Sequence, residues 1–380
     1  MSAELRPAWA EIDPGALSAN YQALSALAAP ARITAVVKAD AYGHGAVTVA
    51  GVLFDAGCRD FAVAMVEEGV ELRRSGIDGE ILVLSEAPPD ALSLAAENDI
   101  SVTIYSAEGA KFASAARAAH GGGSILKMHL KVDTGMYRVG ASADRLDEVA
   151  DAALAGDLEG VWSHFAVADG TSDDDIEFTR LQIDRFREAL HRLSARGIVP
   201  TQTHISNTAG LLYYPEARFS IVRVGIGLYG YLPGESARPI ALVPVMSLVS
   251  KVVFIKEVEA NERPSYGRQR ALAKNSLVAT IPVGYADGVP RALFAGGGEV
   301  LINGRRYPLA GMITMDQILV DLGDDSEVSI GDEAVLIGAS GGERIDADEW
   351  AKRCATISWE ILCGISKRIP RRTLGETSGS

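Results

Sequence analysis

Two hydrophobic patterns alternate along the chain from residue 33 to about residue 230. Short runs rich in β-branched residues alternate with longer Ala- and Leu-rich segments, in which the apolar positions recur at helical spacing. Eight such runs, each followed by a helical segment, predict a parallel (β/α)8 barrel rather than an open sheet. The predicted strands are residues 33–39, 60–65, 80–85, 101–106, 125–133, 158–165, 201–206 and 219–226.

The pattern changes after Pro239, where short alternating strands are separated by Gly, Pro, Asn and Asp turns. We therefore expect an α/β chain with a TIM-like (β/α)8 barrel over residues 14–238 and a β-rich carboxyl-terminal domain over residues 239–375. Residues 8–13 also alternate and are expected to add a strand to the second domain. The predicted strands there are residues 245–255, 277–281, 300–302, 317–320 and 334–337, and the predicted helices are residues 346–352 and 356–363.

Charge and composition narrow the class of protein. The formal net charge of −14 argues against a nucleic acid or an anionic membrane as partner. The amino-terminal region lacks a secretory signal, and no apolar run reaches the roughly 18 residues of a membrane span. The 3 cysteines are too few and too scattered for a disulfide framework or a zinc site. These features predict a cytoplasmic protein with reduced thiols and no metal.

Lys38 follows the first predicted barrel strand, after the apolar pair Val36 and Val37. Barrel enzymes build their active sites at the carboxyl ends of their strands. An amine held against apolar neighbours has a lowered pKa, and it can then act as a nucleophile or form a Schiff base. A single strand-end lysine is more often solvated, so the other strand ends decide between these interpretations.

The other strand ends also carry polar residues, and most of the charged ones are cationic. Arg223 lies within a buried strand, where a guanidinium needs a fixed partner, either an acid or a ring nitrogen. Barrels often hold a phosphate between the ends of strands 7 and 8. A candidate nucleophilic lysine, a phosphate site and a buried arginine together suggest pyridoxal phosphate. The residues at these ends are Lys131, Asp133 and Arg138, then His164, then His204, Ser206, Asn207 and Thr208, and finally Arg223, Gly225 and Gly227.

Residues 35–45 resemble the cofactor-lysine signature of bacterial alanine racemases. The resemblance covers nearly the whole chain, and its motifs occur in the family's order. It implies a pyridoxal 5'-phosphate enzyme, an isomerase that interconverts L- and D-alanine and supplies D-alanine for cell-wall peptidoglycan. The further matching segments are residues 129–138, 163–165, 204–208, 222–226, 265–267, 283–288, 311–317 and 356–360.

The resemblance also implies roles for single residues. Lys38 would bind the cofactor covalently and transfer a proton on one face of the substrate. Tyr266, supplied by the second subunit of a homodimer, would be the base on the opposite face. Arg223 would hydrogen-bond the pyridine nitrogen, and Lys131, often carbamylated in this family, would hold Arg138. The remaining cofactor-binding residues would be Tyr42, His164, Asn207, Thr208, Gly225 and Ile226, and those at the substrate carboxylate and the entrance Arg138, Tyr285, Met315 and Asp316.

Two positions depart from the family pattern. Trp359 stands where the family usually has a tyrosine that contacts the phosphate, and an indole N–H can donate a hydrogen bond but cannot accept one. Tyr137 stands directly before Arg138, where many relatives have Gly or Asn. It either crowds the substrate side or faces solvent.

Three alternative functions are open to a chain with these motifs. A decarboxylase of the ornithine or diaminopimelate type would place an acid at the pyridine nitrogen, where this chain has Arg223. A small pyridoxal-phosphate-binding barrel without robust catalysis would lack the β-rich domain and therefore Tyr266. A racemase of another small amino acid, such as serine, would share the same two bases.

Overall fold

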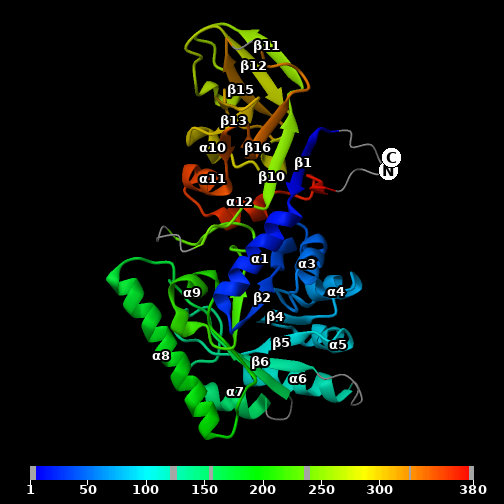
Figure 1. The fold of residues 1–380 in the computed structure, drawn as a ribbon, viewed down its shortest axis with the longest axis vertical. Coiled ribbons are helices and arrows are strands. Elements are labelled where there is room, and N and C mark those ends of the chain that lie inside the picture. The colour runs from blue at the N-terminus through cyan, green and yellow to red at the C-terminus, as the bar shows by residue number, and fades with distance from the viewer. Residues whose placement is uncertain (1–5, 120–125, 154–156, 235–239, 325–326, 376–380) are drawn as a thin grey trace. The chain divides into compact units, whose positions relative to one another are not determined.

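A computed structural model describes residues 6–119, 126–153, 157–234, 240–324 and 327–375 (Figure 1). Their backbone contacts divide the chain into two compact units. The barrel unit comprises Leu17–Ala41 and Ala46–Val243. The β-rich unit comprises the described residues up to Ala16, the short segment Tyr42–Gly45, and the described residues from Pro244 onward. The domain boundary predicted at residue 239 falls in a segment, 235–239, that lies outside the described residues.

The barrel unit is built on eight parallel strands. They are β2 (Arg32–Val36), β3 (Asp60–Val63), β4 (Glu80–Glu86), β5 (Ser101–Ile104), β6 (Lys127–Lys131), β7 (Asp157–Trp162), β8 (Gln202–His204) and β9 (Ile221–Val224). Their order is β8-β7-β6-β5-β4-β3-β2-β9. The two ends of this order meet, because Arg223 N donates to Ser206 O at 3.0 Å and Ser220 N donates to Thr203 O at 3.1 Å. The predicted barrel is confirmed.

Helices connect the strands and lie outside them (Figure 1). They are α1 (Pro14–Ala28), α3 (Ala46–Asp55), α4 (Val66–Arg74), α5 (Pro89–Glu97), α6 (Ala107–Ala119), α7 (Leu146–Ala153), α8 (Asp173–Ala195) and α9 (Thr208–Tyr213), with a 3-10 turn η1 (Pro215–Ala217). The longest, α8, begins where Ser172 Oγ accepts a hydrogen bond from Asp175 N at 3.2 Å. It buries Ile183, Phe186 and Leu193 on one face. Among the described residues, no helix is long and apolar enough to cross a membrane.

The first barrel strand ends earlier than its apolar pattern predicts. Strand β2 stops at Val36, and Lys38 begins a short turn, α2 (Lys38–Tyr42). The φ angles of residues 39–42 lie between 52° and 55°, so this turn is left-handed. L-residues avoid this region because Cβ approaches the following carbonyl oxygen. The expectation of a strand over residues 33–39 is thus wrong at its carboxyl end.

The β-rich unit contains two sheets. The first is seven-stranded and runs β14-β13-β16-β10-β1-β18, with β17 paired to β16, where the strands are β1 (Ala8–Ile12), β10 (Met246–Lys251), β13 (Glu299–Ile302), β14 (Arg305–Pro308), β16 (Glu333–Ser340), β17 (Glu343–Ile345) and β18 (Arg371–Thr373). The second is three-stranded and runs β11-β12-β15, with β11 (Phe254–Val258), β12 (Ser276–Ile281) and β15 (Ile318–Gly323). Strand β1 pairs antiparallel with β10 and parallel with β18.

Two details of this unit differ from the sequence-based expectation. The run predicted as a single strand over residues 245–255 is split between β10 and β11, which belong to different sheets. The short strands β14, β17 and β18 were not predicted, because each is mostly polar and shows no clear alternation. The helical elements of the unit are η2 (Tyr266–Arg268), η3 (Tyr285–Asp287), α10 (Ala292–Ala295), α11 (Ala347–Cys354) and α12 (Ser358–Gly364).

Candidate active site

The carboxyl ends of the barrel strands bring several sequence-predicted residues together. Lys131 is the last residue of β6, His164 lies two residues beyond β7, and Arg223 lies inside β9. His204 ends β8. Because the strands are parallel, these ends lie on one side of the barrel. The hydrogen bonds and ring contacts described below show that these four side chains form one cluster.

Arg223 is only 3% exposed, yet no carboxylate contacts it in the described part of the chain. All its recorded acceptors are neutral: Ser163 O at 2.7 Å, Ile205 O at 3.3 Å, His204 Nδ1 at 2.8 Å and His164 Nδ1 at 3.2 Å. Burial lowers the pKa of its guanidinium to about 9, so it stays mostly charged at neutral pH. The sequence predicted either an acid or a ring nitrogen as the partner of Arg223. The protein supplies ring nitrogens of two histidines, together with backbone carbonyls.

The two histidines beside Arg223 are neutral. Burial, together with the positive charge of Arg223, holds the pKa of His164 and His204 well below the usual range. A guanidinium can only donate hydrogen bonds, so the Nδ1 atoms that face it carry no proton. The arginine therefore keeps an uncompensated positive charge inside the barrel.

Trp162, at the end of β7, packs against both Lys131 and Arg223. The Nζ atom of Lys131 lies 4.4 Å from its ring centroid and the guanidinium carbon of Arg223 lies 4.5 Å away. The ring is also parallel to that of His204, with 5.8 Å between centroids and 2° between planes. The face of an indole ring favours a positive charge on a group that lies over it. Sequence reasoning missed Trp162, because an aromatic residue in a buried strand is most simply interpreted as core.

Lys131 is buried and has an unusually acidic ammonium group. Burial, followed by the charges of Arg223 and Arg138, lowers the pKa of Lys131 to about 7, and Lys38 adds a smaller effect of the same sign. This lowered pKa makes the neutral amine of Lys131 accessible at neutral pH. A neutral amine is nucleophilic, whereas an ammonium group is not.

The loop that follows β6 carries Arg138 and is shaped by one carboxylate. Asp133 Oδ1 accepts hydrogen bonds from the backbone N–H groups of Gly135, Met136 and Tyr137, at 2.9, 3.0 and 3.1 Å. Tyr137 has a left-handed φ of 54° and its side chain is 80% exposed in this chain. Of the two orientations predicted for Tyr137, the single chain has the exposed one.

The left-handed turn that begins at Lys38 is held by side chains. Glu68 Oε1, from α4, accepts from Ala39 N at 2.7 Å, and Asp40 Oδ1 accepts from Ala46 N at 2.8 Å. The other oxygen of Glu68 accepts from Ala64 N at 2.7 Å. Glu68 thus links the residue after Lys38 to the start of α4. The sequence offers no signal for this contact, because Glu68 looks like an ordinary acid in the first turn of a helix.

Of the residues predicted to hold a phosphate, those of the barrel unit lie together where β8 and β9 end, whereas Tyr42 belongs to the β-rich unit. Asn207 Oδ1 caps α9 by accepting from Gly210 N at 2.9 Å. Gly225 N donates to Thr208 Oγ1 at 3.3 Å, so these two residues lie side by side. Ile226 is buried next to them along the chain. Backbone N–H groups and a small hydroxyl of this kind suit the oxygens of a phosphate.

In the β-rich unit, Tyr285 and Met315 lie on two loops that are tied together. Tyr285 N donates to Thr314 O, and Ala286 N donates to Met315 O, both at 3.0 Å. Asp316 accepts a hydrogen bond from Arg368 at 2.7 Å. The structure therefore brings Tyr285, Met315 and Asp316 together, and both Tyr285 and Met315 are exposed.

Tyr266 lies on η2, and its side chain is 72% exposed. The residues around it have left-handed backbone, with φ of 68° at Ser265 and 73° at Gly267. Ser265 Oγ donates to Met312 O at 2.5 Å, which anchors this turn to the segment that leads to Met315.

Tyr42 and Trp359 also belong to the β-rich unit. Tyr42 is buried, and burial raises the pKa of its phenol well above the usual range. A side chain at Gly43 would bring its Cβ within 2.4 Å of Leu362 O in α12, so the backbone after Tyr42 approaches that helix closely. Trp359 is half-buried on the same helix.

The chain is similar to known proteins in both sequence and structure. The family model "Alanine racemase, N-terminal domain" matches residues 12–233, and "Alanine racemase, C-terminal domain" matches residues 245–373. An alanine racemase of Symbiobacterium thermophilum is 43% identical over 378 residues, which cover 98% of this chain and 99% of that protein. A solved alanine racemase structure from Clostridium difficile 630 has a TM-score of 0.91 at 35% identity, covering 98% of this chain and 96% of that chain.

A histidine racemase structure from Leuconostoc mesenteroides subsp. sake is also similar, with a TM-score of 0.87 at 30% identity over 98% of this chain and 99% of that chain. Solved structures similar to this chain are thus named as racemases of two different amino acids, alanine and histidine. Both family models and the identity over nearly the full length nevertheless agree with the motifs described above. This chain belongs to the alanine racemase family, a family of isomerases that use pyridoxal 5'-phosphate.

Proposed function

We propose that this protein interconverts L-alanine and D-alanine with pyridoxal 5'-phosphate as cofactor, and so supplies D-alanine for cell-wall peptidoglycan. The observation that carries the proposal is the buried Arg223, whose recorded acceptors are all neutral. A permanent cation beside a pyridine nitrogen disfavours protonation of that nitrogen. This limits transamination, a side reaction that a racemase has to suppress.

The residues at the barrel end fit the cofactor. Lys38 binds it covalently, and Arg223, supported by His164, donates to the pyridine nitrogen. The cofactor, when bound, withdraws electrons from Cα of the bound amino acid and makes the Cα proton acidic. The phosphate is held by Tyr42, Asn207, Thr208, Gly225 and Ile226, a proposal that the hydrogen bond between Gly225 N and Thr208 Oγ1 supports.

Racemisation needs a proton removed from one face of Cα and returned to the other, so two bases have to flank this carbon. Lys38 acts on one face and Tyr266 on the opposite face. The high exposure of Tyr266 supports its delivery to the barrel of a second subunit in a homodimer. Arg138, Tyr285, Met315 and Asp316 bind the substrate carboxylate and line the entrance.

Lys131 is carbamylated in this proposal, and the carbamate holds Arg138. The neutral amine attacks the carbon of CO₂, a C–N bond forms, one C–O π pair moves onto oxygen, and the nitrogen releases a proton to water. A pKa of about 7 supplies the neutral amine that this step needs. The product is an anion among Arg138 and Arg223, where an ammonium group would be repelled.

One assay tests the function. Purified protein with pyridoxal 5'-phosphate is incubated with each enantiomer of Ala, Ser, Glu and His, and the chirality of the amino acid is followed over time. We expect alanine to be interconverted fastest. Histidine is included because of the similar histidine racemase structure. If another amino acid is converted faster than alanine, the proposed substrate is wrong. If no amino acid is converted, the protein binds the cofactor without robust catalysis.

A further inference from the structure

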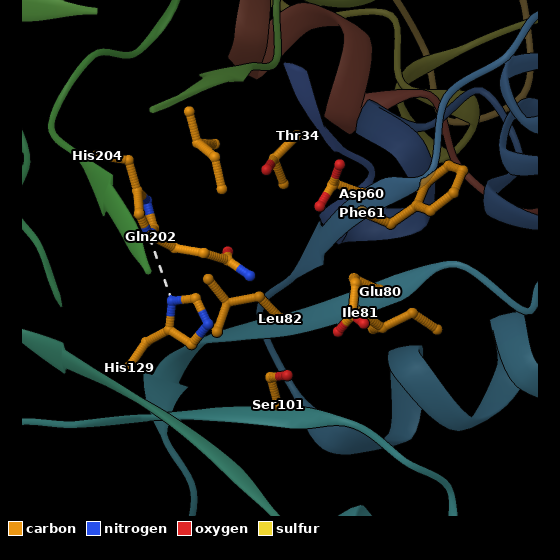
Figure 2. A pocket seen from close by; sticks show the side chains of 11 residues that line it. Thr34, Asp60, Phe61, Glu80, Ile81, Leu82, Ser101, His129, Gln202 and His204 are labelled. Carbon is orange, nitrogen blue, oxygen red and sulfur yellow. Dashed lines mark hydrogen bonds between the residues drawn. The ribbon is translucent and has the colours of Figure 1, made fainter. Parts of the chain in front are cut away.

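A directed chain of hydrogen bonds runs from Arg223 into the barrel. Arg223 Nη1 lies 2.8 Å from His204 Nδ1, and His204 Nε2 lies 3.2 Å from Nδ1 of His129 (Figure 2). A guanidinium has only donors, so His204 has to accept at Nδ1 and carry its proton on Nε2. That proton is then donated to His129 Nδ1, and His129 in turn carries its own proton on Nε2. The first bond thus sets the tautomer of both rings.

The chain leads to a small cavity inside the barrel. His129 and His204 both line it, and its volume is about 10 Å³. This is about the space that one water molecule needs, and the polar lining gives that molecule partners. Figure 2 shows side chains from several strands converging on this space. Five lining residues are the first residues of their strands, which places the cavity toward the amino ends: Asp60, Glu80, Ser101, Gln202 and Ile221.

Gly160 on β7 leaves space for the His129 ring of this hydrogen-bond chain. A Cβ atom added there would lie 2.1 Å from His129 Nδ1, the atom that accepts the bond from His204. Glycine weakens the interior of a strand, and this one needs no positive φ. The close approach of His129 is therefore the physical reason for glycine at this position. His129 is itself buried, and burial lowers its pKa to about 3, in agreement with a neutral ring.

We propose that His129 is a positioning residue for Arg223: it accepts the hydrogen bond of His204, fixes that ring as the acceptor of Arg223, and donates from Nε2 to one water molecule bound in the cavity. This inference rests on the proposed function, because Arg223 is the group that faces the pyridine nitrogen there. The ring of Trp162 is parallel to that of His204, with 5.8 Å between the centroids, and this stacking favours the plane that His204 needs for both hydrogen bonds.

The bond directions can be measured without catalysis. The chain contains 6 histidines, so ¹⁵N-histidine labelling gives a spectrum that can be assigned. We expect His129 and His204 to be neutral with the proton on Nε2 from about pH 6 to about pH 9, and a ¹⁵N–¹⁵N coupling across the bond between them. A proton on Nδ1 of either ring, or a charged ring in this range, would overturn the proposal.

Two variants test the effect on Arg223. In His129→Asn the amide oxygen can accept in place of Nδ1, whereas His129→Leu has a similar size and no acceptor. We expect the guanidinium protons of Arg223 to exchange with solvent about tenfold faster in His129→Leu than in wild type, and close to wild type in His129→Asn. The ratio of pyruvate formation to alanine racemisation should rise in the same order.

The outcomes separate this inference from the proposed function. Equal exchange rates of the Arg223 protons in both variants would show that His129 does not position Arg223, whether or not the activity changes. Absence of racemisation in wild type would overturn the proposed function, while the histidine spectra would still decide the hydrogen-bond chain. If His129→Leu does not fold, the wild-type spectra and His129→Asn carry the test.

Discussion

The candidate residues of the barrel unit and those of the β-rich unit are held in opposite ways. Lys131, His204 and Arg223 are buried. Arg223 is hydrogen-bonded to His204 and to Ser163 O, and Lys131 Nζ lies over the ring of Trp162. Tyr266 and Met315 are exposed on turns. A group that sets the charge around a cofactor has to be rigid, since its effect depends on preorganisation. A group that delivers a proton has to reach the substrate, and a second subunit can then place it.

The two proposed bases nevertheless share one backbone feature. Lys38 precedes the left-handed turn of residues 39–42, and Tyr266 lies between Ser265 and Gly267, which are also left-handed. Such backbone costs roughly 1 kcal/mol or more for each L-residue, so the surrounding structure has to hold it. Glu68 does this for the first turn and Ser265 for the second. Hydrogen bonds therefore hold the backbone beside both proposed bases, although Lys38 is half-buried and Tyr266 is exposed.

The largest expected effect concerns the exposed base. Tyr266→Phe removes the phenol proton and should lower racemisation by about 10² to 10⁴-fold, the range of a single acid–base group. Cofactor binding through Lys38 should be unchanged, as measured by the absorbance of the bound cofactor. In D₂O, exchange of the Cα proton should continue for one enantiomer only. Loss of exchange for both enantiomers would show that the two bases do not divide the work.

A side chain at Gly160 should damage the buried region. Gly160→Ala places Cβ against His129 Nδ1, so we expect a loss of about 2 to 3 kcal/mol in the free energy of unfolding, measured by denaturant titration. Gly51→Ala is the matched control, because it lies in α3 with no atom within 4 Å of the added Cβ. That variant should stabilise the protein by about 0.5 to 1 kcal/mol. Equal changes in the free energy of unfolding for the two variants would show that the His129 side chain can move away from the added Cβ at little cost.

The buried amine predicts a pH dependence. Lys131 has a pKa of about 7 in the folded protein and an ordinary value of 10.5, so between these values the unfolded chain binds more protons. The free energy of unfolding of wild type, relative to Lys131→Met, should therefore rise from about pH 7 to about pH 10.5 in CO₂-free buffer. We expect a rise on the order of 2 kcal/mol after solvent screening. Bicarbonate should flatten the curve if Lys131 is carbamylated, and parallel curves of the two proteins in CO₂-free buffer would contradict the lowered pKa.

The smallest effect is expected at Glu349 in the β-rich unit, a carboxylate that pairs with two arginines. Glu349 accepts from Arg306 at 3.0 and 3.1 Å and from Arg353 at 3.1 Å. Glu349→Gln should cost about 1 kcal/mol of unfolding free energy at low salt and less at high salt. Glu327→Gln, which alters an exposed pair with Arg305, is the control and should change stability by less than about 0.5 kcal/mol. A loss that salt does not reduce would argue against the ionic network.

The barrel could be predicted because short apolar runs alternate regularly with helical segments along it. The polar residues at the strand ends then followed from parallel topology. Lys131, His164 and Arg223 were found in this way. Other features gave no local signal. The left-handed turn after Lys38 contains no glycine before Gly43, so nothing in residues 39–42 indicates positive φ.

Contacts between residues distant in sequence were missed for a similar reason. Glu68 binds a backbone N–H group that is 29 residues away, and its own position is typical of a helix start. His129 is an isolated histidine in a strand, and only its partners His204 and Gly160 reveal what it does. Periodicity reports which face of an element is buried, but it does not report which polar atoms meet there.

The place of strand β1 has a consequence for biosynthesis. Its five residues, Ala8–Ile12, precede the barrel in the sequence, yet they pair with Met246–Lys251 and with Arg371–Thr373, which both follow it. The barrel residues are synthesised between β1 and these two partner strands, and they can fold while β1 is unpaired. A nascent chain of this protein therefore carries an unpaired, mostly apolar strand until the residues after the barrel have been synthesised, the kind of surface that chaperones shield.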